Sequence, residues 1–214
     1  GQMIPWNFPL LMAAWKLAPA IAGGNTIVIS PSSHTSLSIL EFMRLIEDVL
    51  PKGVINLVTG KGSKTGEYLQ HHKGFDKLAF TGSTAVGRHI GISAAENLIP
   101  ATLELGGKSA HVIFDDCDMQ KAIEGAQVGI LFNQGEVCSA GSRLFIQETI
   151  YDEFVEKLVK AFENVKVGDP LDPETQMGAL RDKERFTVIE EFIEKAKAAG
   201  GEVLTGCLLY TSDA

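Results

Sequence analysis

Cys138 is the residue of this sequence that is best placed to do chemistry. It lies in a stretch of glycines and small residues, and positions 135–143 read GEVCSAGSR. Such a stretch favours a tight, accessible turn from which a thiolate can attack a carbonyl carbon. The alternative is a buried cysteine that packs as a small hydrophobic residue, and composition alone favours that alternative. Cys117 and Cys207 have no comparable setting, and we interpret them as structural.

Glu104 is the second candidate, because it lies between two leucines at the end of a predicted strand, an unusual place for a surface charge. Successive side chains of a strand point to opposite faces, so we expect Glu104 to leave the sheet toward a cleft. Partial burial there would raise its pKa and make it a competent general base. A salt bridge with Lys108 remains the open alternative.

Two further stretches have residues that could bind a dinucleotide or a substrate oxygen. Positions 80–88 read FTGSTAVGR after a predicted strand and open a helix, where backbone N–H groups favour a pyrophosphate. This stretch matches neither the GxGxxG fingerprint nor a P-loop, so a plain glycine-rich helix start is the alternative. Positions 4–9 read IPWNFP, and the two prolines fix the backbone around Asn7, whose amide can donate hydrogen bonds. Asn7 could instead cap a helix that Pro9 opens.

The elements that must position these residues alternate between strands and helices. Short apolar runs bounded by glycine, proline, serine or aspartate predict strands, and amphipathic stretches between them predict helices. The alternation favours an α/β fold with a Rossmann-like, doubly wound parallel sheet covered on both faces. Ligands of such sheets bind at the carboxyl ends of the strands. The predicted strands are 26–29, 54–58, 77–80, 102–105 and 111–114, and the predicted helices are 36–49, 65–71 and 86–97.

The pattern changes after Leu105. A helix is predicted over 118–131 with Asp118 as its N-cap. Apolar residues at helical spacing predict two more helices, over 151–162 and 186–196, and we place both stripes in the core.

Two glycines at positions 106 and 107 permit a sharp change of direction and mark the predicted domain boundary. The first domain is expected to span 1–106 and the second 107–207, whereas 208–214 has no turn or cap pattern and is interpreted as a non-native tail. The chain opens directly on a dense motif, so we expect an internal piece of a longer protein. The start of the first domain and the end of the second are then missing.

Composition excludes several classes of function. The net charge of -8 argues against nucleic acid or an anionic membrane as a partner, since both require a positive surface. No apolar run is long enough to span a bilayer, and no signal peptide is visible, so we expect a cytoplasmic protein. The cysteines and histidines lack the spacing of a metal site. Adjacent His71 and His72 are interpreted as a solvated polar pair.

Together the four stretches resemble, in the same order, the signature blocks of the NAD(P)-dependent aldehyde dehydrogenases. The blocks read PWNFP at 5–9, FTGST at 80–84, LELGGKS at 103–109 and NQGEVCSAGSR at 133–143. The resemblance extends from position 1 to about position 206 and includes GDPLD at 168–172. It implies a cofactor domain that binds NAD or NADP, followed by part of an α/β catalytic domain, in a parent enzyme that forms homodimers or homotetramers.

The resemblance also implies roles for single residues. Cys138 would attack the aldehyde and form a thiohemiacetal, and the Asn7 amide with the Cys138 backbone N–H would stabilise the oxyanion. After hydride transfer, Glu104 would activate the water that hydrolyses the thioester. The isolated piece is expected to be inactive. The implied cofactor-binding residues are Ile4, Trp6, Asn7, Ser30, Ser33, Phe80, Gly82, Ser83, Gly87 and Leu105.

Ser30 departs from the family pattern, which has a lysine that contacts the adenosine ribose at this position. The loss of a cation predicts weaker cofactor binding, by about 1–2 kcal/mol. Ser33 stands where members that prefer NAD often have a glutamate. A small neutral residue does not repel a 2′-phosphate, so NADP is also admissible.

The substrate and the catalytic status remain open at this stage. The blocks at 97–102 and 175–179 are most similar to those of bacterial members that act on small aliphatic aldehydes. A semialdehyde or phosphorylated-aldehyde dehydrogenase with the same Cys138 and Glu104 is the alternative within the family. A non-catalytic member is another alternative. A cysteine hydrolase would need a histidine beside Cys138, and His111, on a predicted buried strand, is interpreted as a core residue.

Overall fold

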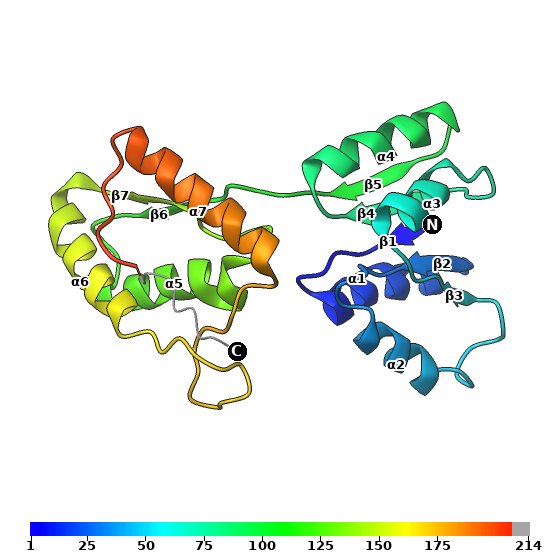
Figure 1. Ribbon diagram of the computed structural model, residues 1–214, viewed down its shortest axis with the longest axis horizontal. Helices are drawn as coiled ribbons and strands as arrows, with labels where there is room; N and C mark the ends of the chain where they lie inside the picture. Colours follow the sequence, from blue (N-terminus) through cyan, green and yellow to red (C-terminus); the bar gives the residue numbers. More distant parts are fainter. Residues whose placement is uncertain (207–214) are drawn as a thin grey trace. The chain divides into compact units, whose positions relative to one another are not determined.

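The computed structural model describes residues 1–206, so Cys207 and the predicted non-native tail at 208–214 lie outside the described residues. The described residues divide into two compact units, one of Gly1–Gly106 and one that begins at Gly107 (Figure 1).

The first unit is built on a five-stranded sheet in which every pairing is parallel. The strands lie in the order β3-β2-β1-β4-β5, which confirms the predicted α/β fold. The ends of the predicted strands were correct to within one residue, but β1 was missed because two residues are too few to show a pattern. The bounds are β1 (Gln2–Met3), β2 (Ile27–Ser30), β3 (Ile55–Leu57), β4 (Leu78–Thr81) and β5 (Ala101–Glu104).

Helices cover both faces of this sheet, with α1 and α2 on one face and α4 on the other (Figure 1). A helix does begin at Pro9 as expected, whereas the predicted helix 36–49 ends at Leu45 and continues only as turns. The helices of this unit are α1 (Pro9–Ala22), α2 (Leu37–Leu45), the π-helical turn η1 (Gly62–Gly66), α3 (Glu67–His71) and α4 (Thr84–Glu96).

Alternation along the strands produces a separate apolar core on each face. Ile27 and Ile29 of β2 pack with α1 and α2, whereas Val28 between them packs on the opposite cluster with Leu78 of β4. Ile29 and Leu78 are fully buried, with 0% of their surface exposed. This two-sided burial holds the strands rigid, so the loops at their carboxyl ends have fixed starting points.

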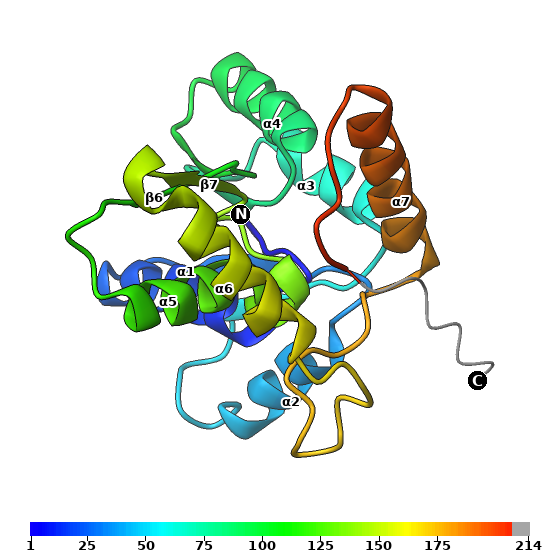
Figure 2. The same cartoon turned by 90° about the vertical axis from the view of Figure 1, so that its left-hand side faces the viewer.

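The second unit contains a short parallel sheet of β6 (Ala110–Ile113) and β7 (Arg143–Ile146). The neighbouring helices α5 (Met119–Leu131) and α6 (Tyr151–Glu163) pack together (Figure 2). The core of the unit includes Phe154 of α6, which is 0% exposed. The predicted cap of α5 is confirmed, because Asp118 Oδ1 accepts a hydrogen bond from the Lys121 N–H at 3.2 Å. The short kinked turn η2 (Phe132–Gly135), the 3₁₀ turn η3 (Glu148–Ile150) and the helix α7 (Lys183–Ala198) complete the unit.

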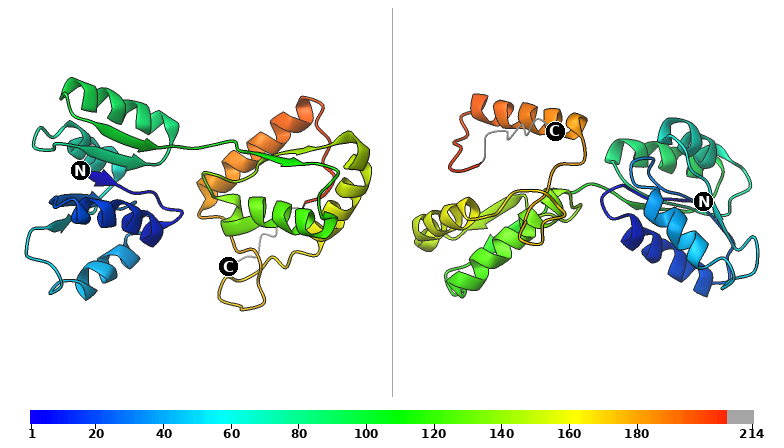
Figure 3. Two further views of the ribbon diagram at one scale, coloured as in Figure 1. Left: turned by 180° about the vertical axis from the view of Figure 1, so that it is seen from behind. Right: turned by 60° about the horizontal axis from the view of Figure 1, so that its bottom comes forward.

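Two predictions about the core of the second unit were wrong. The apolar stripe of α7 is not buried, since Phe192 is 66% exposed and the helix stands apart from α5 and α6 (Figure 3). Likewise β6 is not a buried strand. His111 is half-buried and Val112 is 51% exposed, because α5 and α6 pack on only one face of the two-stranded sheet.

Candidate active site

The candidate residues of the first unit gather at one edge of its sheet. Because all five strands are parallel, their carboxyl ends lie at the same edge. The chain leaves β1 toward β2 in one direction and β4 toward β5 in the other, so the switch point of the topology lies between β1 and β4. The loops at this edge carry Ile4, Trp6 and Asn7 after β1, Ser33 after β2, Gly82 and Ser83 after β4, and Leu105 after β5.

Backbone hydrogen bonds hold neighbouring loops of this edge together. The Ile4 N–H donates to the Ser30 carbonyl oxygen at 3.1 Å, and the Gly82 N–H donates to the Glu104 carbonyl oxygen at 3.0 Å. Ile4 is 4% exposed and Ser30 is 7% exposed, so these two side chains present little surface to a ligand. Ser33, by contrast, is exposed.

The loop after β1 does not use Asn7 as the helix cap that the sequence left as an alternative. The N-cap position of α1 is occupied by Phe8, whose side chain makes no capping hydrogen bond. Asn7 lies one residue earlier, half-buried at the carboxyl edge.

The loop after β4 has the features of an anion-binding helix start. Ser83 is the N-cap of α4, and its Oγ accepts a hydrogen bond from the Val86 N–H at 3.3 Å. A Cβ on Gly87 would lie 2.4 Å from Leu105 Cδ2, so a larger residue at position 87 would have to displace the Leu105 side chain. The N-terminus of α4, with its partial positive charge, therefore lies beside the switch point and fits the pyrophosphate of a dinucleotide.

Lys16 is a charged residue of this edge that the sequence analysis missed. It extends from α1, and its Nζ donates to Thr81 Oγ1 at 2.7 Å. Burial lowers the pKa of the Lys16 ammonium below its ordinary value, and the charge of Glu104 partly offsets this shift. A signal was present, because Lys16 is the only Asp, Glu, Lys or Arg among the first 40 residues.

Glu104 is the last residue of β5, and its side chain is exposed. The expected partial burial is therefore wrong for the structure described. The reason is that β5 is the edge strand of the sheet and has a neighbour on one side only. The carboxylate remains accessible to water at the carboxyl edge.

Cys138 lies in the second unit, whereas Glu104 and Asn7 lie in the first. Its side chain is exposed, on the loop between η2 and β7. The Gly141 N–H ties the far end of this loop to the Gly129 carbonyl oxygen of α5 at 2.9 Å. A Cβ on Gly107 would lie 2.4 Å from the Cys138 carbonyl oxygen, so Gly107 backs directly onto the backbone of the cysteine.

The remaining candidates for chemistry in the second unit have structural settings. Cys117 is half-buried against the core around Ile113, as its structural interpretation expected. His111 packs against Gly129 and Gly141. This setting is that of a packed histidine and does not support a cysteine hydrolase.

Other kinds of site were sought in the part of the chain that the structure describes. No cluster of three metal-ligating side chains occurs there. Among the same residues, none of the helices has the length and apolar character required to cross a bilayer.

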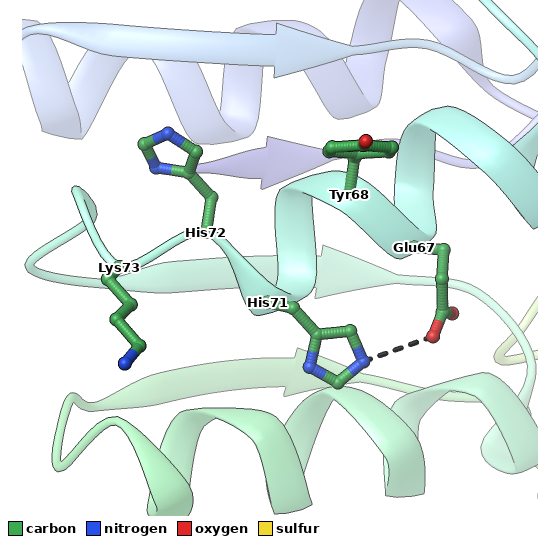
Figure 4. Close-up of a pocket in the computed structure, with 5 residues that line it drawn as sticks. All are labelled: Glu67, Tyr68, His71, His72 and Lys73. Carbon is green, nitrogen blue, oxygen red and sulfur yellow. Dashed lines mark hydrogen bonds and ion pairs between the residues drawn. The ribbon is translucent and has the colours of Figure 1, made fainter.

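A pocket of about 440 Å³ lies away from the carboxyl edge, beside α3 and the amino end of β4 (Figure 4). His71 and His72 point in different directions, as expected, but each has a protein partner instead of being merely solvated. His71 Nε2 lies 3.0 Å from Glu67 Oε1, and its Nδ1 lies 3.1 Å from the Oγ of buried Ser93. This pocket contains none of the residues predicted to do chemistry.

Comparison with known proteins identifies relatives over nearly the whole chain. The model described as "Aldehyde dehydrogenase family" matches residues 1–213. A protein of Vibrio cholerae serotype O1 named "Aldehyde dehydrogenase" is 50% identical over 212 residues, which are 96% of this chain and 42% of that protein.

Two solved structures of NAD⁺ complexes are also similar. Aldehyde dehydrogenase from Bacillus cereus has a TM-score of 0.95 and 44% identity over 98% of this chain and 43% of its own. Betaine aldehyde dehydrogenase from Staphylococcus aureus has a TM-score of 0.93 and 42% identity over 96% of this chain and 41% of its own. The chain therefore spans about 42% of the length of the relatives it matches.

Proposed function

Because the chain belongs to the aldehyde dehydrogenase family, we propose that the protein in which it occurs oxidises an aldehyde to a carboxylic acid with NAD(P). The observation that carries the proposal is the exposed Cys138 on a loop held against Gly107 and α5. An exposed thiol on a constrained backbone is what covalent catalysis at a carbonyl carbon requires.

Each unit is assigned one part of the reaction. Residues 1–106 form the cofactor-binding domain, and the described part of 107–207 belongs to the catalytic domain. NAD is the first choice of cofactor, because the Bacillus cereus and Staphylococcus aureus relatives were solved as NAD⁺ complexes. The small, exposed Ser33 keeps NADP admissible, because it does not repel a 2′-phosphate.

The proposed chemistry begins when the Cys138 thiolate attacks the aldehyde carbon. A C–S bond forms and the carbonyl electron pair moves to oxygen, where the Asn7 amide and the Cys138 backbone N–H donate hydrogen bonds to the oxyanion. NAD(P), when bound, supplies the acceptor for the hydride that this carbon loses, and a thioester then remains on Cys138. Glu104 takes a proton from water as the water oxygen attacks the thioester carbon. The C–S bond breaks, the acid leaves, and the thiolate is restored.

The substrate is proposed to be a small aliphatic aldehyde. A second candidate is a cationic aldehyde, because a relative with 42% identity is named betaine aldehyde dehydrogenase. Semialdehydes and phosphorylated aldehydes remain alternatives. A homodimer or homotetramer is the assembly proposed for the whole protein.

The test measures NADH and NADPH production by the intact protein with a panel that includes each of these aldehyde types. Cys138→Ala is expected to abolish turnover, whereas the matched control Cys117→Ala retains it. Turnover by Cys138→Ala would refute the assignment of the nucleophile. If the folded protein turns over no combination of aldehyde and cofactor, the interpretation as a non-catalytic member of the family is favoured.

Ser30→Lys separately tests the departure from the family pattern at Ser30, the last residue of β2. A lysine at this position is expected to tighten cofactor binding by about 1–2 kcal/mol, the scale of a hydrogen bond to a charged group. Calorimetric titration with NAD measures the change directly. An unaltered dissociation constant would show that this position does not contact the cofactor.

A further inference from the structure

The loop before Cys138 has a backbone conformation that L-amino acids rarely adopt. Asn133 has φ of 49°, Gln134 has φ of 56°, and Gly135 has φ of 74°. Non-glycine residues in this region cost free energy and persist only when their surroundings hold them there. One constraint lies within the loop, since the Glu136 N–H donates to the Asn133 carbonyl oxygen at 2.9 Å. Further constraints are needed to hold the loop against the rest of the unit.

Glu136 supplies a constraint of this kind, two residues before the thiol. Its carboxylate accepts a hydrogen bond from the backbone N–H of Arg181. The positive charges of Arg181 and Arg185 act on the same carboxylate, and the negative charge of Asp182 opposes them. Glu136 is half-buried, so the contact is sheltered from competing water.

The segment on the other side of this contact is itself well fixed. Asp182 caps α7, since its Oδ1 accepts a hydrogen bond from the Arg185 N–H at 2.9 Å. Its Oδ2 accepts a second hydrogen bond from Arg181 Nε at 2.7 Å. A parallel link runs beside it, because Gln134 Nε2 donates to the Ala179 carbonyl oxygen at 3.3 Å. The loop is therefore joined twice to the segment that leads into α7.

We propose that Glu136 is a positioning residue, whose carboxylate ties the loop of Cys138 to the backbone of Arg181 and thereby orients the thiol. The inference rests on the proposed function for the role of the thiol, but the tie can be tested without it. The side chain acts as a hydrogen-bond acceptor at a fixed reach. A side chain of the same length that accepts a hydrogen bond should therefore replace Glu136, whereas a shorter acidic side chain should not.

The experiment measures amide deuterium exchange and steady-state kinetics on the intact protein. Glu136→Ala removes the acceptor, Glu136→Gln keeps an acceptor of the same length, and Glu136→Asp keeps the charge on a shorter side chain. Glu190→Ala on exposed α7 is the matched control. The exchange of the 132–138 segment is compared with that of α6 (Tyr151–Glu163), which reports on the stability of the unit.

Glu136→Ala and Glu136→Asp are expected to speed exchange at 132–138 by about tenfold or more, with α6 unchanged, because only the local opening becomes easier. Both lower kcat by about tenfold to a hundredfold with the KM for NAD unaltered, since misplacement of a reacting group slows chemistry without weakening remote binding. Glu136→Gln restores both readouts to within about threefold of the parent, as a hydrogen-bond acceptor should.

Equal loop exchange in the parent and in Glu136→Ala would overturn the proposal. The proposal would also be overturned if Glu136→Ala sped amide exchange in α6 as much as in the 132–138 segment. It would be overturned too if Glu136→Asp matched Glu136→Gln in loop exchange and kcat. If Glu136→Ala does not fold, the comparison of Glu136→Gln with Glu136→Asp in loop exchange and kcat still tests the proposal. A parent protein without turnover would refute the dehydrogenase function, whereas the exchange comparison would stand.

Discussion

Gly107 offers a sharp test of how closely the second unit controls the position of its nucleophile. A Cβ built on Gly107 lies 2.4 Å from the Cys138 carbonyl oxygen and 3.7 Å from the Cys138 carbonyl carbon. Carbon and oxygen atoms in close contact are about 3.3–3.6 Å apart, so Gly107→Ala forces a separation of about 1 Å. The obstructing atom belongs to the backbone and cannot rotate away as a side chain would. The displacement therefore falls on the backbone of residue 107, on that of Cys138, or on both.

A shift of about 1 Å at a reacting group can reduce the rate by about a hundredfold, which corresponds to about 2.7 kcal/mol of activation free energy. The extra methyl group also costs about 1–3 kcal/mol of stability through overpacking. Alanine also lowers the conformational entropy of the unfolded variant, which offsets about 0.4–1 kcal/mol of this loss of stability. We expect a folded protein with a somewhat lower melting temperature and a much lower kcat.

The adjacent glycine provides the matched control. A Cβ on Gly106 meets no atom within 4 Å, so Gly106→Ala should leave kcat within about threefold of the parent. Aldehyde-dependent NADH production and iodoacetamide labelling of Cys138 are measured for both variants, with thermal unfolding as the check on folding. If folded Gly107→Ala turns over as fast as Gly106→Ala, the contact does not control the nucleophile.

Four further predictions concern the packing and the titration of residues within single units. Gly87→Ala should lower the free energy of unfolding by about 1–3 kcal/mol, because its Cβ would lie 2.4 Å from Leu105. Gly91→Ala in the same helix should instead raise it by about 0.5–1 kcal/mol in urea titrations. Phe154→Ala should lower it by about 3–5 kcal/mol, since this ring is 0% exposed, and a loss below about 1 kcal/mol would contradict the assigned core. Burial raises the pKa of Glu136 above its ordinary value of 4.5, so the folded state binds more protons and the parent loses stability as pH rises from about 4.5 through the raised value. Glu136→Gln should lack that loss, and unfolding curves of equal pH dependence for both proteins would refute the shift.

Local patterns in the sequence predicted most of the first unit. Four of its five strands were found because each is an apolar run bounded by turn residues, and the helix starts at Pro9 and Asp118 follow from local backbone chemistry. β1 was missed because two residues show no alternation. The stripe on α7 was wrongly assigned to the core, since periodicity identifies an apolar face but not the surface that would cover it.

The sequence by itself determined the family, the α/β class and the identity of the candidate chemical groups. These properties follow from residue types that lie close together in the sequence, so they can be recognised without the tertiary structure. Only the tertiary structure revealed the contacts of Lys16 with Thr81, Gly107 with Cys138, and Glu136 with Arg181. The members of these pairs are 65, 31 and 45 residues apart (81 − 16, 138 − 107 and 181 − 136), and no local pattern encodes such pairings. They arise because packing brings distant segments together, and burial then shifts the pKa values of the ionisable groups and fixes the geometry of the groups that meet.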